Sequence, residues 1–115
     1  MFEIKWLPTA EQTYTELLLA AKKSLENRKR NQKLKASPVE GLFKQVHKCI
    51  QLLKDNPRHP GLKTHEYDSF VHPYDVTQKV FEAYVQNNTP GAYRVFWCYG
   101  PLKKEITIIA ITPHP

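Results

Sequence analysis

Two runs of alternating side chains near the C-terminus constrain the fold more than any other feature of this sequence. They span residues 92–99 and 105–112, and residues 100–104 supply turn-forming glycine, proline and lysine between them. Successive side chains of a β-strand point to opposite faces of the sheet. The first run therefore places two sets of residues on opposite faces: Tyr93, Val95, Trp97 and Tyr99 on one, and Ala92, Arg94, Phe96 and Cys98 on the other. We expect a β-hairpin whose first face, with Trp97, belongs to the core.

Arg94 is the unusual residue of this hairpin, because arginine is seldom placed in an apolar strand unless an anion meets it. A histidine, His114, follows the second run directly. The strand before the hairpin is expected near Val80, with Glu82 and Tyr84 on the side opposite Phe81. Residues 87–91, Asn-Asn-Thr-Pro-Gly, are typical of a hairpin loop.

The N-terminal part of the chain predicts a strand followed by two helices. Alternation over residues 2–7 indicates a strand that Pro8 ends, and Thr9 with Gln12 then predicts a capping box for a helix from about residue 10 into the thirties. Ser37, with proline and glutamate after it in capping positions, predicts a second helix that ends near residue 54. The two should pack as an antiparallel hairpin.

Together these elements predict an α+β fold: an N-terminal strand, an antiparallel helical hairpin and a three-stranded antiparallel meander. At 115 residues, we expect residues 1–115 to form one domain. No apolar run is long enough to span a bilayer, and the N-terminus lacks a signal-peptide layout. The two cysteines are expected to be free core residues in a reducing cytoplasm. The net charge of +6 indicates either an anionic partner, namely nucleic acid or an acidic protein, or simply a basic surface. We expect no membrane partner and no small-molecule cofactor.

Three motifs resemble the RelE/ParE superfamily of small basic toxins from toxin–antitoxin modules, here in its RelE-like form. The motifs are Asn56-Pro57 with His59-Pro60-Gly61-Leu62-Lys63, then Gly91-Ala92-Tyr93-Arg94-Val95-Phe96-Trp97, and finally Ile106-Thr107-Ile108-Ile109-Ala110-Ile111 with His114. The resemblance covers residues 37–115 well and the first helix only by position. It implies the α+β order described above.

The resemblance also implies a function. Many members are metal-independent endoribonucleases that cleave mRNA on the ribosome and thereby inhibit translation, and a cognate acidic antitoxin holds them inactive. The sequence thus predicts an mRNA interferase whose partners are an antitoxin, mRNA and ribosomal RNA. The alternative is a non-catalytic member of the fold, either a gyrase poison or an inactive toxin that binds nucleic acid or protein. A plain RNA-binding basic protein is a third hypothesis.

Metal-free cleavage of RNA needs a base for the 2′-hydroxyl, positive charge for the phosphorane and an acid for the leaving oxygen. The candidate catalytic residues are Arg94, His114, His65 and Glu82. Arg94 would bind phosphate, or alternatively pair with Glu82 across the hairpin. Glu82 departs from the family pattern, which has basic residues on this strand, so it either acts as a base or neutralises Arg94.

The candidate RNA-binding residues lie in the loop before the meander, on its first strand and along the first helix: His59, Lys63, Tyr84, Lys22, Lys23, Arg28, Lys29 and Arg30. The stretch from Lys22 to Lys35 carries seven basic residues against a single acid, Glu26. It suits ribosomal RNA, an acidic antitoxin or simple solvation. The histidines and acids of residues 59–75 match no metal-binding spacing, so no metal site is predicted.

Overall fold

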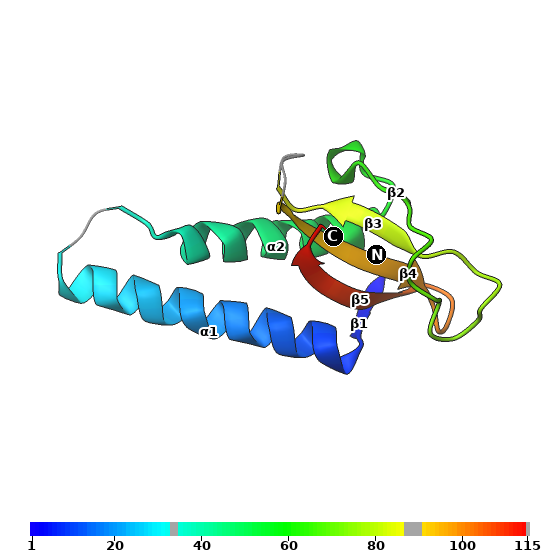
Figure 1. The fold of residues 1–115 in the computed structure, drawn as a ribbon, viewed down its shortest axis with the longest axis horizontal. Helices are drawn as coiled ribbons and strands as arrows, with labels where there is room; N and C mark the ends of the chain where they lie inside the picture. Colours follow the sequence, from blue (N-terminus) through cyan, green and yellow to red (C-terminus); the bar gives the residue numbers. More distant parts are fainter. Residues whose placement is uncertain (33–34, 87–90, 115) are drawn as a thin grey trace.

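The computed structural model describes residues 1–32, 35–86 and 91–114. A helical hairpin packs against one face of a five-stranded sheet and extends beyond it, giving an elongated molecule of 52 × 27 × 23 Å (Figure 1). The elements are β1 (Glu3–Trp6), α1 (Pro8–Arg30), α2 (Pro38–Asp55), the 3₁₀ turn η1 (Pro60–Leu62), β2 (His65–Glu66), β3 (Phe81–Tyr84), β4 (Tyr93–Tyr99) and β5 (Glu105–Pro113). The predicted α+β class is confirmed, with a sheet larger than the predicted meander.

The sheet has the order β1-β5-β4-β3-β2. Strands β3, β4 and β5 form the predicted antiparallel meander, to which two strands are added. β1 pairs in parallel with β5 at one edge, and the two-residue β2 pairs antiparallel with β3 at the other. The predicted hairpin loop at residues 87–90 lies outside the described residues.

Local sequence signals predict the start of α2 correctly but not the start of α1. Helix α2 begins as predicted, because the backbone N–H of Ser37 donates to the Glu40 carboxylate at 3.0 Å and Pro38 takes the first helical position. The predicted start of α1 is wrong. Pro8 opens the helix after an extended Leu7, so Thr9 lies within the first turn instead of capping it. Neither helix in the described part of the chain is long and apolar enough to cross a membrane.

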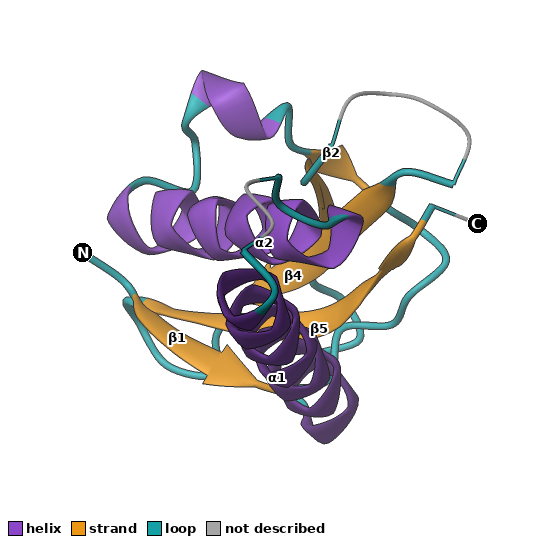
Figure 2. Cartoon of the chain, turned by 90° about the vertical axis from the view of Figure 1, so that its left-hand side faces the viewer, coloured by secondary structure: helices purple, strands orange, loops and turns teal. Residues whose placement is uncertain are grey.

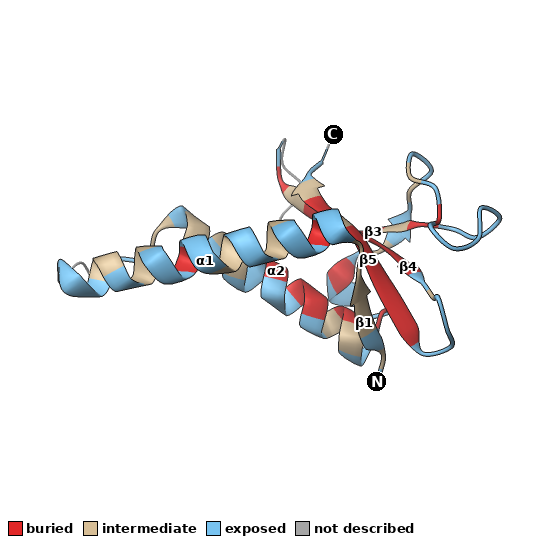
Figure 3. Cartoon of the chain, turned by 90° about the horizontal axis from the view of Figure 1, so that it is seen from below, coloured by how far each residue is buried: buried red, intermediate tan, exposed pale blue. Residues whose placement is uncertain are grey.

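The main core lies between the helices and the sheet (Figure 2). Val95 and Trp97 on β4 are buried there, as their alternation predicts, together with Ala83 on β3 and Val46 and Leu53 on α2. Cys49 and Cys98 are both free and buried. In Figure 3 the central strands are almost wholly buried, whereas the far end of α1 is largely exposed.

A second, smaller core lies on the opposite face of the sheet, where the sequence predicts only an irregular segment. Phe96 is fully buried there, and the aromatic rings of Tyr67 and Phe70 pack on it at centroid distances of 4.6 and 5.0 Å. The segment between β2 and β3 is fastened by His72, whose Nε2 bonds the Tyr99 carbonyl oxygen at 2.8 Å. One half of this second face is thus covered, and the other half carries the candidate site.

Candidate functional site

A buried carboxylate lies at the centre of the candidate site. Glu82 is 1% exposed, and each of its oxygens pairs with a different histidine. Oε1 is 2.6 Å from Nε2 of His65, and Oε2 is 2.6 Å from Nδ1 of His114. A buried carboxylate needs charged or hydrogen-bonding partners. The two histidines supply them while remaining 47% and 44% exposed themselves.

Strand pairing brings these residues together from distant parts of the sequence. His65 lies directly opposite Glu82 in the β2–β3 pair, so the two side chains share a face. His114 follows β5, and its backbone N–H donates to the Ala92 carbonyl oxygen at 2.9 Å. That bond fixes the end of the chain, so the His114 ring reaches over β4 to the carboxylate.

The hydrogen bonds of the two rings distinguish their proton positions. The carboxylate only accepts, so Nε2 of His65 and Nδ1 of His114 donate to it. Nδ1 of His65 is 3.2 Å from the Lys63 carbonyl oxygen, which also only accepts. His65 therefore makes both contacts as donor when its ring is doubly protonated. His114 directs a single nitrogen at Glu82, which leaves Nε2 as the nitrogen available for proton transfer.

Arg94 lies on β4, between the strands that carry Glu82 and His114. Its side chain is buried, and its Nη1 donates to the Tyr93 carbonyl oxygen at 2.9 Å. The guanidinium carbon is 4.0 Å from the centroid of the Tyr84 ring, a close cation–π contact. The strand register places Arg94 opposite Tyr84, and Glu82 opposite Phe96. Across the hairpin Arg94 thus contacts the tyrosine ring, whereas the carboxylate of Glu82 is held by the two histidines.

Lys63 and Tyr84, both predicted to bind RNA, complete the cluster. The Lys63 ammonium is 5.9 Å from the Tyr84 ring centroid, and the His65 ring meets that tyrosine edge-on at 5.8 Å. Lys63 has a left-handed backbone with φ of 49°, which positions the residues that follow it toward β2. We call Lys63, His65, Glu82, Tyr84, Arg94 and His114 the polar cluster.

The other predicted contact residues lie apart from the polar cluster. His59 caps η1, since its Nδ1 accepts the Gly61 N–H at 2.9 Å. Arg28 forms a 2.8 Å ion pair with Glu40 that joins α1 to α2. Arg28 holds the pKa of the Glu40 carboxyl at about 2, with help from the Ser37 N–H. The remaining basic residues of α1, namely Lys22, Lys23, Lys29 and Arg30, lie on the projecting half of the helical hairpin (Figure 1).

Sequence reasoning named all six residues of the polar cluster but missed how they connect. The cross-strand contact between His65 and Glu82 depends on β2, which was not predicted. His72 belongs to the second core instead of the site. Within the described ranges, no three histidine, cysteine, aspartate or glutamate side chains gather closely enough to hold a metal ion.

Comparison with solved structures shows the same fold in bacterial toxins. A YoeB/ParE toxin from Agrobacterium tumefaciens matches with a TM-score of 0.58 over 98% of this chain and 99% of that one, at 11% identity. The YoeB–YefM toxin–antitoxin complex from Staphylococcus aureus contains a chain that matches with a TM-score of 0.54, covering 100% and 99% of the two chains at 12% identity. The chain has the RelE/ParE toxin fold.

A third structure, a copper-bound mutant toxin from Helicobacter pylori, matches with a TM-score of 0.54 over 99% of this chain and 96% of that one, at 12% identity. No protein-family model and no curated protein sequence matches the chain. The likeness to the RelE/ParE toxins is therefore one of fold, which spans nearly the whole chain at a sequence identity of 11–12%. The polar cluster has to be interpreted from its own geometry.

Proposed function

We propose that this protein is a RelE-like toxin, an endoribonuclease that cleaves ribosome-associated mRNA without a metal ion and so inhibits translation. The observation that supports this most directly is the carboxylate of Glu82 held between two half-exposed histidines at 2.6 Å each. Two imidazoles that differ in proton position supply an acid and a base near neutral pH. Arg94 and Lys63 add positive charge beside them.

In the proposed reaction His114 acts as the base. Its Nε2 takes the proton of a ribose 2′-hydroxyl while that oxygen attacks the adjacent phosphorus. The bond from phosphorus to the 5′-oxygen breaks, and His65 donates a proton to that oxygen from Nδ1, the nitrogen with the longer contact. The products are a 2′,3′-cyclic phosphate and a free 5′-hydroxyl. Proton exchange with water then restores both rings.

Glu82 acts in this scheme as a positioning residue. Because its side chain is 1% exposed, it holds the two rings without touching the RNA. A carboxylate that accepts from an imidazole N–H fixes the tautomer and stabilises the imidazolium when it forms. The prediction that Glu82 serves directly as the base is therefore replaced by a proposal in which it orients the base.

Arg94 and Tyr84 complete the proposal. Arginine offers a planar, permanently charged fork that suits a phosphorane oxygen. The guanidinium is buried beside Tyr84, so a phosphate reaches it only after the covering side chains shift. Rotation of Tyr84 away from Arg94 would both open the fork and present the tyrosine ring for base stacking.

The test uses purified protein and ribosomes programmed with a defined message in ordinary magnesium buffer. We expect discrete cuts with 2′,3′-cyclic phosphate ends. A message with a single 2′-deoxy residue at the cut position should resist cleavage there, because the attacking hydroxyl is missing. Free RNA in EDTA should be cleaved slowly at the same kinds of step. Cutting that persists at the 2′-deoxy position would contradict the mechanism.

One observation favours the alternative of a non-catalytic toxin, and that is the burial of Arg94. A guanidinium stacked on Tyr84 also stabilises the sheet without any contact to phosphate. If expression arrests growth but no message is cut, DNA supercoiling by purified gyrase should be measured next. Loss of supercoiling would assign the protein to the gyrase poisons. RNA binding that falls steeply with salt and survives His114→Ala would instead indicate a plain RNA-binding protein.

An acidic antitoxin is the proposed protein partner, as the YoeB–YefM complex is a toxin–antitoxin pair. The basic helical hairpin suits such a partner by charge. A cavity of about 260 Å³ lies between its helices, lined by apolar residues including Leu18, Leu25 and Phe43, with Lys22 and Lys44 beside them. Charge reversal at Lys22 and Lys44 should weaken co-purification with the product of a neighbouring acidic reading frame. Unchanged co-purification would move the contact elsewhere.

A further inference from the structure

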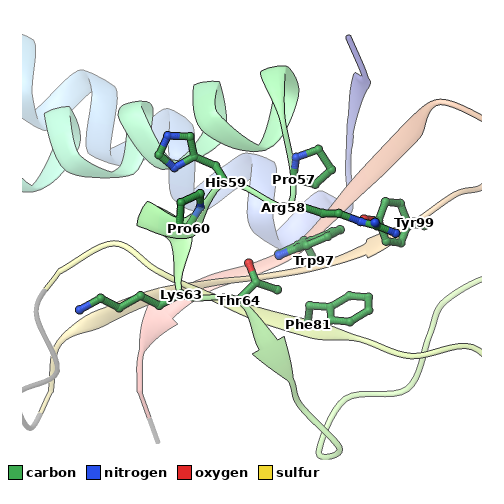
Figure 4. A pocket seen from close by; sticks show the side chains of 9 residues that line it. All are labelled: Pro57, Arg58, His59, Pro60, Lys63, Thr64, Phe81, Trp97 and Tyr99. Atoms are coloured by element: carbon green, nitrogen blue, oxygen red, sulfur yellow. The ribbon is translucent and has the colours of Figure 1, made fainter.

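A second cavity lies on the helix-facing side of the sheet, across the sheet from Glu82 and Arg94, and it reaches the polar cluster at Lys63. Its walls combine aromatic rings with cations. Its volume is about 450 Å³, within the range of small-ligand sites of roughly 300–1,000 Å³. Figure 4 shows Phe81, Trp97 and Tyr99 from the sheet on one side, and Arg58 and other residues of the connection that follows α2 on the other. The proposed cleavage scheme uses none of these four residues.

The aromatic rings on one side of the cavity are held in place by packing against one another, and one of them is partly exposed. Phe81 stacks on Trp97 at 4.9 Å between ring centroids, and Tyr99 meets Trp97 edge-on at 5.0 Å. Trp97 itself is 1% exposed, whereas Tyr99 is 38% exposed. The packed pair therefore fixes the orientation of a tyrosine whose ring is still open to a ligand.

Two polar atoms of the cavity lining lack a hydrogen-bond partner. Nε1 of Trp97 and Oγ1 of Thr64 are both buried, and neither has a partner within the described part of the chain. Figure 4 shows the side chains of both residues among those that line the cavity. A buried donor without a partner is unfavourable, so a ligand acceptor that reached these atoms after a small shift of Thr64 would be stabilised.

Position connects this cavity to the polar cluster. Lys63 lines the cavity and also approaches the Tyr84 ring, and Thr64 directly precedes His65. An RNA chain that passes the β2 edge of the sheet at Lys63 can therefore place a phosphate at the polar cluster and a neighbouring nucleotide in the cavity. Aromatic rings interleaved with cations favour single-stranded nucleic acid, because bases stack while phosphates pair with the charges.

We propose that the cavity formed by Arg58, Thr64, Phe81, Trp97 and Tyr99 is a subsite for one nucleobase of the RNA bound at the polar cluster. The base stacks on Tyr99 and the adjoining edge of Phe81, and its phosphate contacts Arg58. Lys63, at the opposite end of the cavity, contacts a phosphate nearer the polar cluster. Thr64 and the indole N–H of Trp97 supply the polar contacts that distinguish one base from another. This inference rests on the proposed function, since it takes RNA as the substrate.

The fluorescence of Trp97 can report binding in the cavity directly, because the chain has just two tryptophans. A Trp6→Phe background leaves Trp97 as the sole tryptophan. The probe is a five-nucleotide RNA with 2′-O-methyl sugars, which binds without being cleaved. We expect saturable quenching of Trp97 fluorescence. Tyr99→Leu should raise the Kd roughly five- to hundredfold, as stacking on an aromatic ring predicts. Arg58→Gln should lower the slope of log K against log salt by about 0.7.

Three controls make the result specific. Lys79→Gln removes an exposed charge from the segment before β3 and should leave binding unchanged. The isosteric Thr64→Val should change the preference among bases while the thermal melt by circular dichroism stays within a few degrees. Mononucleotides should bind at least tenfold more weakly than the pentamer. Equal affinity would overturn the RNA origin of the base and indicate a free nucleotide as ligand.

Other outcomes separate this inference from the proposed function. RNA that binds and is cleaved on ribosomes, with no change in Trp97 fluorescence and no effect of Tyr99→Leu or Arg58→Gln, would overturn the subsite alone. Quenching by an acidic peptide in place of RNA would also overturn it and assign the cavity to a protein partner. Saturable quenching by RNA without any message cleavage would support the subsite and count against the endoribonuclease.

Discussion

The two faces of strands β3 and β4 are equally buried but chemically opposite. On the face toward the helices, Ala83, Val95 and Trp97 are at most 1% exposed and pack against apolar side chains. On the other face Glu82 and Arg94 are also 1% exposed. A buried charge is costly unless it is paired, and such pairs are weak evidence for stability. The comparison therefore assigns a stabilising role to Ala83 and Val95 on the helix-facing side, and the proposed activity to the part of the other face that carries Glu82 and Arg94.

The largest expected effect is on catalysis at the polar face. His114→Ala removes the proposed base and should lower the single-turnover rate of message cleavage by roughly 10²–10⁴-fold. It should also lower the free energy of unfolding by about 1–3 kcal/mol, because it removes the partner of one oxygen of the buried Glu82 carboxylate, so the rate is measured per folded molecule. His47→Ala, an exposed histidine on α2 that contacts Tyr14, is the matched control and should retain full cleavage. Equal loss in both variants would remove the distinction between the faces.

The next effect is on stability at the apolar face. Leu53 on α2 is fully buried against the sheet. Leu53→Ala should lower the free energy of unfolding by about 2–5 kcal/mol, because it removes apolar contacts and leaves a cavity. Urea unfolding measures this change, and cleavage per folded molecule should be unaltered. A cleavage rate that falls while the protein remains folded would show that the helices also position the polar cluster.

The sequence predicted the apolar face better than the polar one, and the reason is the range of the interactions. Alternation places Val95 and Trp97 in the core, and Ser37 with Glu40 marks the start of α2, because these signals are local. The polar cluster depends on β2, whose two residues show no apolar alternation and form a strand through pairing with β3. Likewise, the burial of Phe96 depends on the rings of Tyr67 and Phe70, which lie more than 25 positions away in the sequence. No local pattern reveals such a contact. At Pro8 two local signals compete, and the proline at the first helical position prevails over the predicted Thr9 cap.

A third test asks whether the polar face acts as one unit. Glu82→Gln keeps the shape of the carboxylate but removes its charge, and it should slow cleavage roughly 10–100-fold. Added to His114→Ala, it should have almost no further effect on the rate, since groups that act together are not additive. A double-mutant cycle on the single-turnover rate measures this coupling. Full additivity would show that Glu82 serves the fold and not the base.

The ion pair between Arg28 and Glu40 belongs to the helical hairpin and to neither face of the sheet. Its contribution to stability can be tested by varying the pH. The carboxyl of Glu40 has its pKa lowered from 4.5 to about 2, chiefly by Arg28 and then by the Ser37 N–H. Because this pKa is lowered on folding, the ionised Glu40 carboxylate stabilises the fold fully above about pH 4.5, and this stabilisation is lost as the pH falls toward 2. In the Glu40→Gln variant the free energy of unfolding should depend less on pH over this range. The measurement is urea unfolding between pH 5 and about 2, with cleavage at neutral pH unchanged.

The smallest effect tests whether the polar face was kept at some cost to stability. Lys63 has a left-handed backbone with φ of 49°, and Gln32, beyond the end of α1, has a similar φ of 56°. Glycine adopts this conformation without the steric cost that other residues bear, so each change to glycine should stabilise the fold by up to about 1 kcal/mol. Gln32→Gly should do so with no loss of cleavage. Lys63→Gly should gain similar stability yet weaken RNA binding and slow cleavage, because it removes a cation shared by the polar cluster and the neighbouring cavity. If Lys63→Gly cleaves as fast as Gln32→Gly, the lysine contributes nothing that the glycine lacks, and its strained backbone would have to be explained by the path of the chain into β2 alone.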